Sequence, residues 1–325
     1  MQVIKIQNGN LAAKLIPYGA RLIDIRMKPF NFSLILGYPD VMDYFNDTHY
    51  MGAIVGRVAN RIDAAKAMIA GLNYTFDKNE YSKQTLHGGK QSCAFQKWQI
   101  YDVSDTSATF ILNEPDGHMG FPGNLHFKVR YAIKKPMKLE IRMEAISDKD
   151  GICNLASHPY FCLDDSDDIS RHELKINATH YLPVNELLIP TGKINTVSNS
   201  QFNFLEPRSL SAIIKGKKSE IDHNFCTSDS KTSLREVAVL KSKLSNIIMR
   251  VLSTEPGLQV YTGHHLSHTP NGYNKRSYQP FNGLCLEPQG WPDAPNKKNF
   301  PSIFLPKNTL YKQTSCFEFT NYQQS

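Results

Sequence analysis

Two neighbouring segments of this chain alternate apolar and polar side chains with a period of two residues. In residues 125–133 the apolar side chains occupy every second position, and residues 139–145 repeat the pattern. Successive side chains of a β-strand point to opposite faces of a sheet, so this period is typical of half-buried strands rather than of helices. The intervening Lys134-Lys135-Pro136 predicts a turn between the two strands.

Similar runs continue along the chain. Further strands are predicted at residues 108–112, 246–252, 258–261 and 310–319. Glycine and proline interrupt the gaps between these runs, and residues 208–215 are expected to form a short helix. No internal repeat or break in composition marks a linker. We therefore predict an all-β chain, a large antiparallel β-sandwich with few short helices, in one domain that covers residues 1–325.

The composition fits a globular protein, with 41% hydrophobic and 21% charged residues. No stretch approaches the roughly 18 consecutive apolar residues of a membrane span. Residues 1–25 lack the basic start and long apolar run of a secretory signal, so none is expected. The six cysteines are scattered without a tight framework, which favours free thiols. The expected location is cytoplasmic, with no membrane partner.

The sequence offers little sign of nucleic-acid, nucleotide or metal binding. The formal net charge is +7, and basic residues cluster at 215–218 and 297–298, but without interleaved aromatic residues. Solvated loop charge is the favoured interpretation of these clusters. The phosphate-loop, dinucleotide, zinc-protease and nucleophile-elbow motifs are absent. His264, His265 and His268 lie in a Ser/Pro/Asn-rich segment and are expected to be exposed loop residues. No nucleic-acid partner, metal or cofactor is expected.

Glu287 follows the apolar run Gly283-Leu-Cys-Leu286 and precedes a proline-rich polar loop. Carboxylates are seldom buried without a partner or a task. At this level Glu287 is either one half of an ion pair or a catalytic carboxylate whose pKa is tuned by its surroundings. Because its approach is apolar, a routine surface role is the weaker interpretation.

Several other polar residues lie in apolar or turn-like contexts and are candidate site residues. They are Asn60, Arg61, His87, His158, Tyr160, Asp222 and Gln259. The two glycines after His87 would let a backbone and a ligand approach closely. Each candidate also has a structural interpretation. The alternatives are a carboxylate partner for Arg57 and Arg61, a turn residue for His87, a satisfied structural histidine for His158, core packing for Tyr160 and Trp291, a turn cap for Asp222 and a solvent-facing position for Gln259.

Taken together and in order, these segments resemble the aldose 1-epimerase (galactose mutarotase) family. The matching segments are residues 56–62 (GRVANRI), 86–89 (LHGG), 157–161 (SHPYF), 189–192 (IPTG), 222–225 (DHNF), 258–263 (LQVYTG) and 286–296 (LEPQGWPDAPN). Each motif alone is weak, but their order covers nearly the whole chain. Two segments depart from the family pattern, residues 91–95 before Trp98, and Cys162 after the 157–161 motif. Both departures bear on sugar preference.

The resemblance implies a single-domain β-supersandwich with an open sugar cleft and no cofactor. It implies that Glu287 is the catalytic base and His158 the catalytic acid. It further implies that His87, Arg61, Asn60, Asp222 and Gln259 hold the sugar hydroxyls and ring oxygen, with Tyr160 beside them. The expected activity is interconversion of the α and β anomers of a free hexose such as galactose or glucose, by a monomer or homodimer.

Three other functions stay open at this level. The first is mutarotation of a ketose or of a hexose 6-phosphate; the phosphate version needs extra cations such as Arg57 or the lysine-rich loops. The second is a non-catalytic carbohydrate-binding protein, which would not need a matched acid and base. The third is a structural scaffold without ligand.

Overall fold

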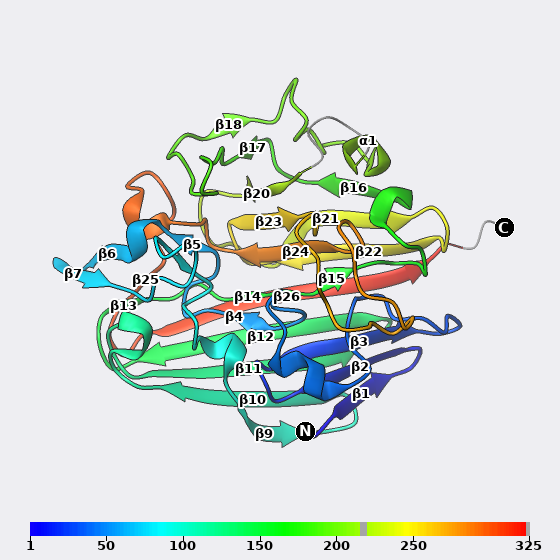
Figure 1. The fold of residues 1–325 in the computed structure, drawn as a ribbon, viewed down its shortest axis with the longest axis horizontal. Helices are drawn as coiled ribbons and strands as arrows, with labels where there is room; N and C mark the ends of the chain where they lie inside the picture. The colour runs from blue at the N-terminus through cyan, green and yellow to red at the C-terminus, as the bar shows by residue number, and fades with distance from the viewer. Residues whose placement is uncertain (215–219, 323–325) are drawn as a thin grey trace.

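The computed structural model of the chain describes residues 1–214 and 220–322. Its largest sheet has nine strands (Figure 1), and every pairing between neighbours is antiparallel. In spatial order they are β19 (Arg208–Ser209), β16 (His172–Ile176), β21 (Arg235–Ser242), β22 (Ile247–Ser253), β26 (Leu310–Asn321), β12 (Lys138–Ser147), β11 (Leu125–Lys134), β10 (Ser107–Glu114) and β9 (Gln99–Val103).

A second, six-stranded antiparallel sheet carries four of the eight candidate residues, namely Tyr160, Asp222, Gln259 and Glu287. Its strands are, in order, β15 (Tyr160–Phe161), β24 (Leu284–Gln289), β23 (Gly257–Tyr261), β20 (Asp222–Cys226), β17 (His180–Tyr181) and β18 (Asn195–Thr196). A three-stranded sheet is formed by β1 (Ile4–Asn8), β2 (Leu11–Ile16) and β3 (Arg21–Met27).

Short strand pairs and turns complete the molecule. The pairs are β4 (Ile54–Val55) with β14 (Ala156–Ser157), β5 (Arg61–Ile62) with β8 (Thr85–Leu86), β6 (Lys66–Ile69) with β7 (Leu72–Thr75), and β13 (Gly151–Ile152) with β25 (Phe304–Leu305). The 3-10 helices are η1 (Val41–Phe45), η2 (Asp63–Ala65), η3 (Cys93–Phe95), η4 (His118–Gly120), η5 (Ile169–Arg171) and η6 (Ala294–Asn296).

The two large sheets pack against each other through one apolar core. Leu258, Leu284 and Leu286 of the smaller sheet belong to the same buried cluster as side chains from β21, β22 and β26 of the larger one. The rings of Phe161 on β15 and Phe317 on β26 lie 5.0 Å apart, centroid to centroid. Full burial of one such side chain stabilises a fold by about 1.5–3 kcal/mol relative to exposure. The predicted β-sandwich is confirmed.

The predicted strands also agree with the structure, because each one lies within or beside an observed strand. The predicted short helix at residues 208–215 is confirmed for residues 211–214 and wrong for residues 208–209. Arg208 and Ser209 form β19, since they pair with β16, and the helix α1 covers only Ser211–Ile214. Lys215 and the basic cluster at 215–218 lie outside the described residues. The six cysteines are free, as predicted. Among the described residues, no helix is both long and apolar enough to cross a membrane.

Candidate active site

A polar cavity of about 180 Å³ collects most of the candidate residues. Its lining comprises Thr48, His49, Tyr50, Asn60, Arg61, Glu80, Leu86, His87, His158, Tyr160, Asp222, Tyr261, His265 and Glu287. These residues come from segments spread along most of the chain. A cavity in which several polar side chains converge is the usual form of a small-molecule site.

A larger hollow of about 340 Å³ lies between the acidic loop at residues 164–168 and the loop at residues 273–282. Its charged groups are already partnered, because Arg276 pairs with Asp167 and Ser242 donates to Asp164 at 2.5 Å. Asp164 pairs with His172 at 3.8 Å, but His172 is not among the residues that line this hollow, so its lining does not present a facing acid and base. The chemistry points to the smaller, polar cavity.

The alternation of three adjacent strands puts polar side chains on the cavity face of the six-stranded sheet. On β24, Leu284 and Leu286 enter the core while Glu287 lines the cavity. Gln259 of β23 lies directly opposite Glu287 in the strand register, and Asp222 of β20 lies opposite Tyr261 of β23. Because side chains alternate between faces, one face supplies the core and the other supplies the site.

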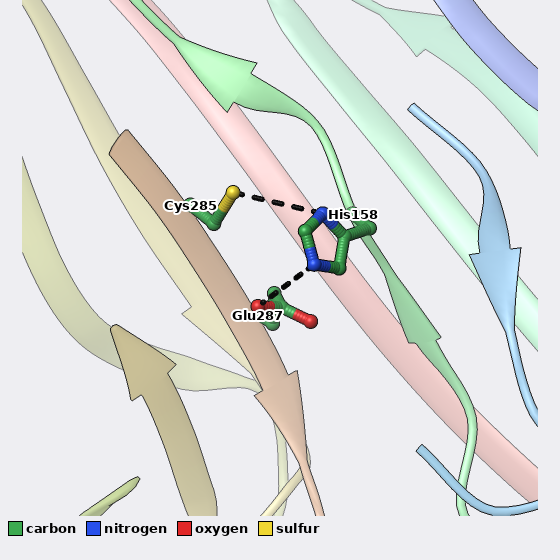
Figure 2. A group of neighbouring side chains, drawn as sticks. All are labelled: His158, Cys285 and Glu287. Carbon is green, nitrogen blue, oxygen red and sulfur yellow. Dashed lines mark hydrogen bonds and ion pairs between the residues drawn. The ribbon is translucent and has the colours of Figure 1, made fainter. Parts of the chain in front are cut away.

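His158 reaches Glu287 because its segment runs antiparallel to β24. Tyr160 pairs with Cys285, so the same register extended by two residues sets His158 beside Glu287. The His158 Nε2 atom lies 3.6 Å from Glu287 Oε1, and the Cys285 Sγ atom lies 3.6 Å from His158 Nδ1 (Figure 2). The imidazole therefore has the thiol at one nitrogen and the carboxylate at the other.

Burial controls the protonation of this pair. Glu287 is 2% exposed and His158 is 5% exposed. Desolvation raises the pKa of Glu287 well above its usual value, and nearby Asp222 raises it further while Arg61 lowers it. Desolvation also lowers the pKa of His158 to about 4. Both shifts disfavour the doubly charged form, so over a wide pH range the pair holds one proton in total.

His87 and Asn60 are held together by two hydrogen bonds. The backbone N–H of Asn60 donates to His87 Nδ1 at 3.1 Å, and the backbone N–H of His87 donates to Asn60 O at 3.0 Å. Both residues have left-handed backbones, with φ of 50° for His87 and 64° for Asn60. Desolvation, followed by the field of His158, lowers the pKa of His87 well below its usual value. A neutral His87 with Nδ1 as acceptor carries its proton on Nε2 and can donate from there.

Arg61 is held by two carboxylates. Its Nε and Nη2 atoms each lie 2.9 Å from a Glu80 oxygen, and its Nη1 lies 3.4 Å from Asp222 Oδ2. Gln259 donates to the other Asp222 oxygen at 2.5 Å. Burial would lower the pKa of Arg61, but Asp222 and Glu80 outweigh it and raise that pKa. Two polar atoms of the site, Glu287 Oε2 and Gln259 Oε1, are buried without a hydrogen-bond partner among the described residues.

The structure excludes the structural alternatives for Gln259 and Asp222 and confirms those for Arg57 and Trp291. Gln259 is 3% exposed, so the solvent-facing alternative is wrong for it. Asp222 lies within β20 and bonds Arg61 and Gln259, so it does not cap a turn. Arg57 does not face the cavity, since it is buried and pairs with Glu114 at 3.2 Å. Trp291 packs against Phe300 and donates to Pro256 O at 3.0 Å, as the packing alternative predicted.

The glycine prediction needs a correction. A side chain at Gly88 would lie 2.1 Å from the carbonyl oxygen of Gly56, and the φ of Gly88 is 86°. Gly88 therefore permits a close approach between two backbone segments rather than between backbone and ligand. This contact ties the His87 segment to the segment that carries Asn60 and Arg61.

The sequence alone does not identify some of the residues that line the cavity. Tyr261 follows the same alternation as Gln259 and was detectable from it. Tyr50, whose ring lies 4.6 Å from that of His87, and Glu80 lie in loops without a local pattern, so only the tertiary structure identifies them. His265 is exposed, as predicted for its loop, but it also lines the cavity. Tyr160 lines it too, and its hydroxyl donates to His49 O at 3.0 Å.

His158, Cys285 and Glu287 form a buried group whose nitrogen, sulfur and oxygen atoms lie within 4.8 Å of one another. The group does not suit a single metal ion. The thiol faces Nδ1 and the carboxylate faces Nε2 (Figure 2), and the lone pairs of the two ring nitrogens point in different directions. Cys285 is also not a nucleophile in this setting, because desolvation raises its pKa well above the usual value.

Comparison with known proteins places this geometry in a family. The aldose 1-epimerase profile matches residues 2–318. The galactose mutarotase of Mus musculus is 33% identical over 98% of this chain and 94% of its own length. The aldose 1-epimerase of Escherichia coli strain K12 is 30% identical over 96% of this chain and 93% of its own length.

Solved structures share the fold along the full chain. A GalM/aldose epimerase homologue from C. elegans superposes with a TM-score of 0.92 at 27% identity and covers 99% of both chains. A galactose 1-epimerase from Lactobacillus acidophilus NCFM superposes with a TM-score of 0.86 at 25% identity, covering 98% of this chain and 94% of its own. Profile, sequence and fold agree over nearly every residue, and the chain belongs to the aldose 1-epimerase family.

Proposed function

We propose that this chain interconverts the α and β anomers of a free hexose such as galactose or glucose. The observation that carries the proposal is the buried pair of His158 and Glu287, whose facing atoms lie 3.6 Å apart in a polar cavity. Anomerisation needs one base and one acid acting on neighbouring oxygens of a sugar. The pair supplies both, and the reaction needs no further reagent.

The proposed reaction opens and recloses the hemiacetal ring. The pKa shifts favour the form of the pair in which the shared proton is on Glu287, and the reactive form is the tautomer in which that proton has moved to His158. In this tautomer Glu287, as carboxylate, takes the proton of the C1 hydroxyl while the bond between C1 and the ring oxygen breaks. His158, as imidazolium, gives a proton to the ring oxygen, which leaves an open-chain aldehyde. After rotation about C1–C2 the transfers reverse, and the ring closes on the other face of the aldehyde. The pair holds one proton before and after ring opening, so only its position changes.

The remaining cavity residues are proposed to bind the sugar. Neutral His87 can donate from Nε2, and Arg61 can stabilise negative charge that develops on the ring oxygen. Asn60, Asp222 and Gln259 have amide or carboxylate groups suited to sugar hydroxyls. Tyr160, whose ring lies 5.2 Å from that of His158, forms a wall beside the acid.

The alternatives gain less support. A hexose 6-phosphate needs a free cation, and Arg57, one candidate, is already bound to Glu114 and to the carbonyl oxygens of Pro122 and Gly123. The lysines at 215–218 lie outside the described residues. A non-catalytic carbohydrate-binding protein would need no buried acid–base pair, which is costly to keep. No observation favours a ketose over an aldose.

Polarimetry tests the proposal directly. Fresh α-galactose and α-glucose relax slowly in a dilute non-phosphate buffer, and the purified chain is expected to accelerate both relaxations in proportion to its concentration. A panel that adds xylose, arabinose, fructose and glucose 6-phosphate then ranks the substrates. If no sugar relaxes faster than in buffer alone, the proposed activity is wrong. Calorimetric binding of a sugar without acceleration would instead support the carbohydrate-binding alternative.

We also propose that the chain acts in the cytoplasm as a single domain and as a monomer or homodimer. The support for the compartment is the set of six free cysteines, since free thiols are typical of reducing compartments. Light scattering after size-exclusion chromatography measures the assembly, and a single unfolding transition by calorimetry is expected for one domain. A mass above that of a dimer, or two separate transitions, would contradict these proposals.

A further inference from the structure

Glu80 occupies the edge of the Arg61 guanidinium that is formed by Nε and Nη2. Arginine side chains in general bind carboxylates and phosphates through this edge. The two Glu80 oxygens each accept a hydrogen bond of 2.9 Å, one from Nε and one from Nη2 of Arg61. A fork of two parallel bonds is the geometry by which arginine recognises planar anions. In this chain an internal carboxylate therefore fills the anion-binding edge of the guanidinium.

Glu80 is itself held in place. It begins a tight turn in which Glu80 and Gln84 exchange backbone hydrogen bonds of 3.2 Å. The side chain of Gln84, which is 1% exposed, donates to Glu80 and, at 3.0 Å, to Leu187 O. The Glu80 side chain is 12% exposed and that of Arg61 is 9% exposed. Hydrogen bonds from Arg61 on one side and from Gln84 on the other therefore keep the partly buried Glu80 carboxylate on Arg61 rather than in solvent.

The charge of the cavity follows from this contact. Among the residues that line it, Arg61 is the single lysine or arginine, and it faces two carboxylates, Glu80 and Asp222. The acid–base pair adds no net charge while it holds one proton. An incoming anion therefore meets an excess of negative charge and finds the one guanidinium fork already filled.

We propose that Glu80 is a specificity-determining residue, which reserves the cavity for uncharged sugars by blocking Arg61 as a site for anionic ones. The anionic sugars in question are monosaccharides that carry a carboxylate or a phosphate at C6. This proposal rests on the proposed function, because specificity is measured on anomer interconversion. It assigns Glu80 a second effect as well, since the same fork orients Arg61 for neutral sugars.

Glucose and glucuronate form a matched substrate pair. Both have the same pyranose ring, and they differ at C6, where glucuronate has a carboxylate in place of a hydroxymethyl group. The ratio of their kcat/KM values therefore isolates the effect of charge from the effect of ring binding. Each value is the enzymatic acceleration of mutarotation over a non-phosphate buffer, and glucose 6-phosphate serves as a second anion.

The variant Glu80→Gln keeps the size of the side chain and removes its charge. We expect the glucose value to fall a few-fold, because the fork is weakened, while the ratio of glucuronate to glucose rises by about tenfold or more. Glu80→Asp keeps the charge and is expected to keep the discrimination. The control Glu144→Gln changes the total charge equally on β12, outside the cavity lining, and should leave the ratio unchanged.

A second readout separates specificity from simple loss of structure. Arg61 lowers the pKa of Glu287, and Glu80 offsets the charge of Arg61. In Glu80→Gln the alkaline limb of the pH profile is therefore expected to move to lower pH, which a merely loosened loop would not cause. Glu80→Ser provides a second neutral variant if Glu80→Gln does not fold, as judged by thermal unfolding.

Different results would contradict the role of Glu80 and the proposed activity. An unchanged ratio in both neutral variants, or wild-type turnover of glucuronate equal to that of glucose, overturns the role of Glu80. Wild-type failure with every neutral sugar overturns the proposed function instead. In that case calorimetric titration with glucose and glucuronate still tests Glu80. The neutral variants should bind glucuronate more tightly than the wild type does. Unchanged glucuronate affinity in both variants would reject the inference.

Discussion

Two buried glutamates, Glu114 and Glu287, have the same exposure and opposite surroundings. Each is 2% exposed. Glu114 accepts from Arg57 at 3.2 Å and from Gln96 at 3.0 Å, so both of its oxygens are bonded. Glu287 has His158 at 3.6 Å, and its second oxygen has no hydrogen-bond partner among the described residues. The fold bonds both oxygens of Glu114 and leaves one oxygen of Glu287 unbonded, which agrees with the proposed role of Glu287.

The difference also shows in the pKa values. Desolvation raises the pKa of Glu114, but Arg57 acts against that shift. Desolvation raises the pKa of Glu287 as well, and there the charge of Asp222 adds to the shift. A fully paired carboxylate contributes to a unique fold, whereas an incompletely paired one costs stability and gains reactivity. The contrast predicts opposite consequences when each charge is removed.

The largest effect is expected for Glu287→Gln. Loss of the base should lower kcat for anomer interconversion by roughly 10²–10⁴-fold. The stability of the fold should stay equal or rise, since a poorly partnered buried acid is replaced by a neutral amide. Polarimetry and thermal unfolding measure the two quantities. Full activity in Glu287→Gln would remove Glu287 from the mechanism.

Removal of Arg57, the partner of Glu114, should have the opposite consequences: a large loss of stability and a small change in activity. Arg57→Met leaves a buried carboxylate without its cation and should lower the free energy of unfolding by about 3–5 kcal/mol. Activity per folded molecule should change only a few-fold, because Arg57 does not line the cavity. Denaturant unfolding, with turnover normalised to folded protein, checks this. A loss of activity without a loss of stability would mean that the two regions are not separate.

The protonation of His158 and Glu287, and not that of Glu114, should set the pH dependence of the activity. Burial lowers the pKa of His158 to about 4 and raises that of Glu287. As the pH falls through about 4, the pair gains a second proton and loses its base; as the pH rises through the raised pKa of Glu287, the pair loses the shared proton and its acid. Plotting kcat/KM against pH should give a broad plateau between these limits. An acid limb near the usual histidine pKa would contradict the buried pair, and Glu114→Gln should leave the profile in place.

The smallest effect is expected at Cys285. Its thiol lies 3.6 Å from His158 Nδ1, so Cys285→Ala removes a weak polar partner of the acid (Figure 2). A neutral hydrogen bond contributes about 0.5–1.5 kcal/mol, which corresponds to a few-fold loss in kcat. Cys285→Ser should restore the contact and the rate. Cys316→Ala removes a buried thiol on β26, outside the cavity lining, and serves as the control, with unchanged kcat.

Much of the fold could be predicted from the sequence. The strands at residues 125–133 and 139–145 were clear because their alternation is long and unbroken, and they became β11 and β12. The predicted helix does not extend to residues 208–209, because their pairing with β16 overrides the weak helical pattern there. His265 shows the same limit for the site, since a loop position has no period that reveals whether it faces a cavity.

The β class, the unusual apolar approach to Glu287 and the family resemblance are visible in the amino-acid sequence, because alternation and local motifs are properties of short segments. Only the folded chain shows that His158 lies beside Glu287, that Arg57 pairs with Glu114 and that Glu80 covers Arg61. Those contacts join segments far apart in the chain. Their register is set by packing of the whole core, and no local pattern encodes which strand will become the neighbour of another.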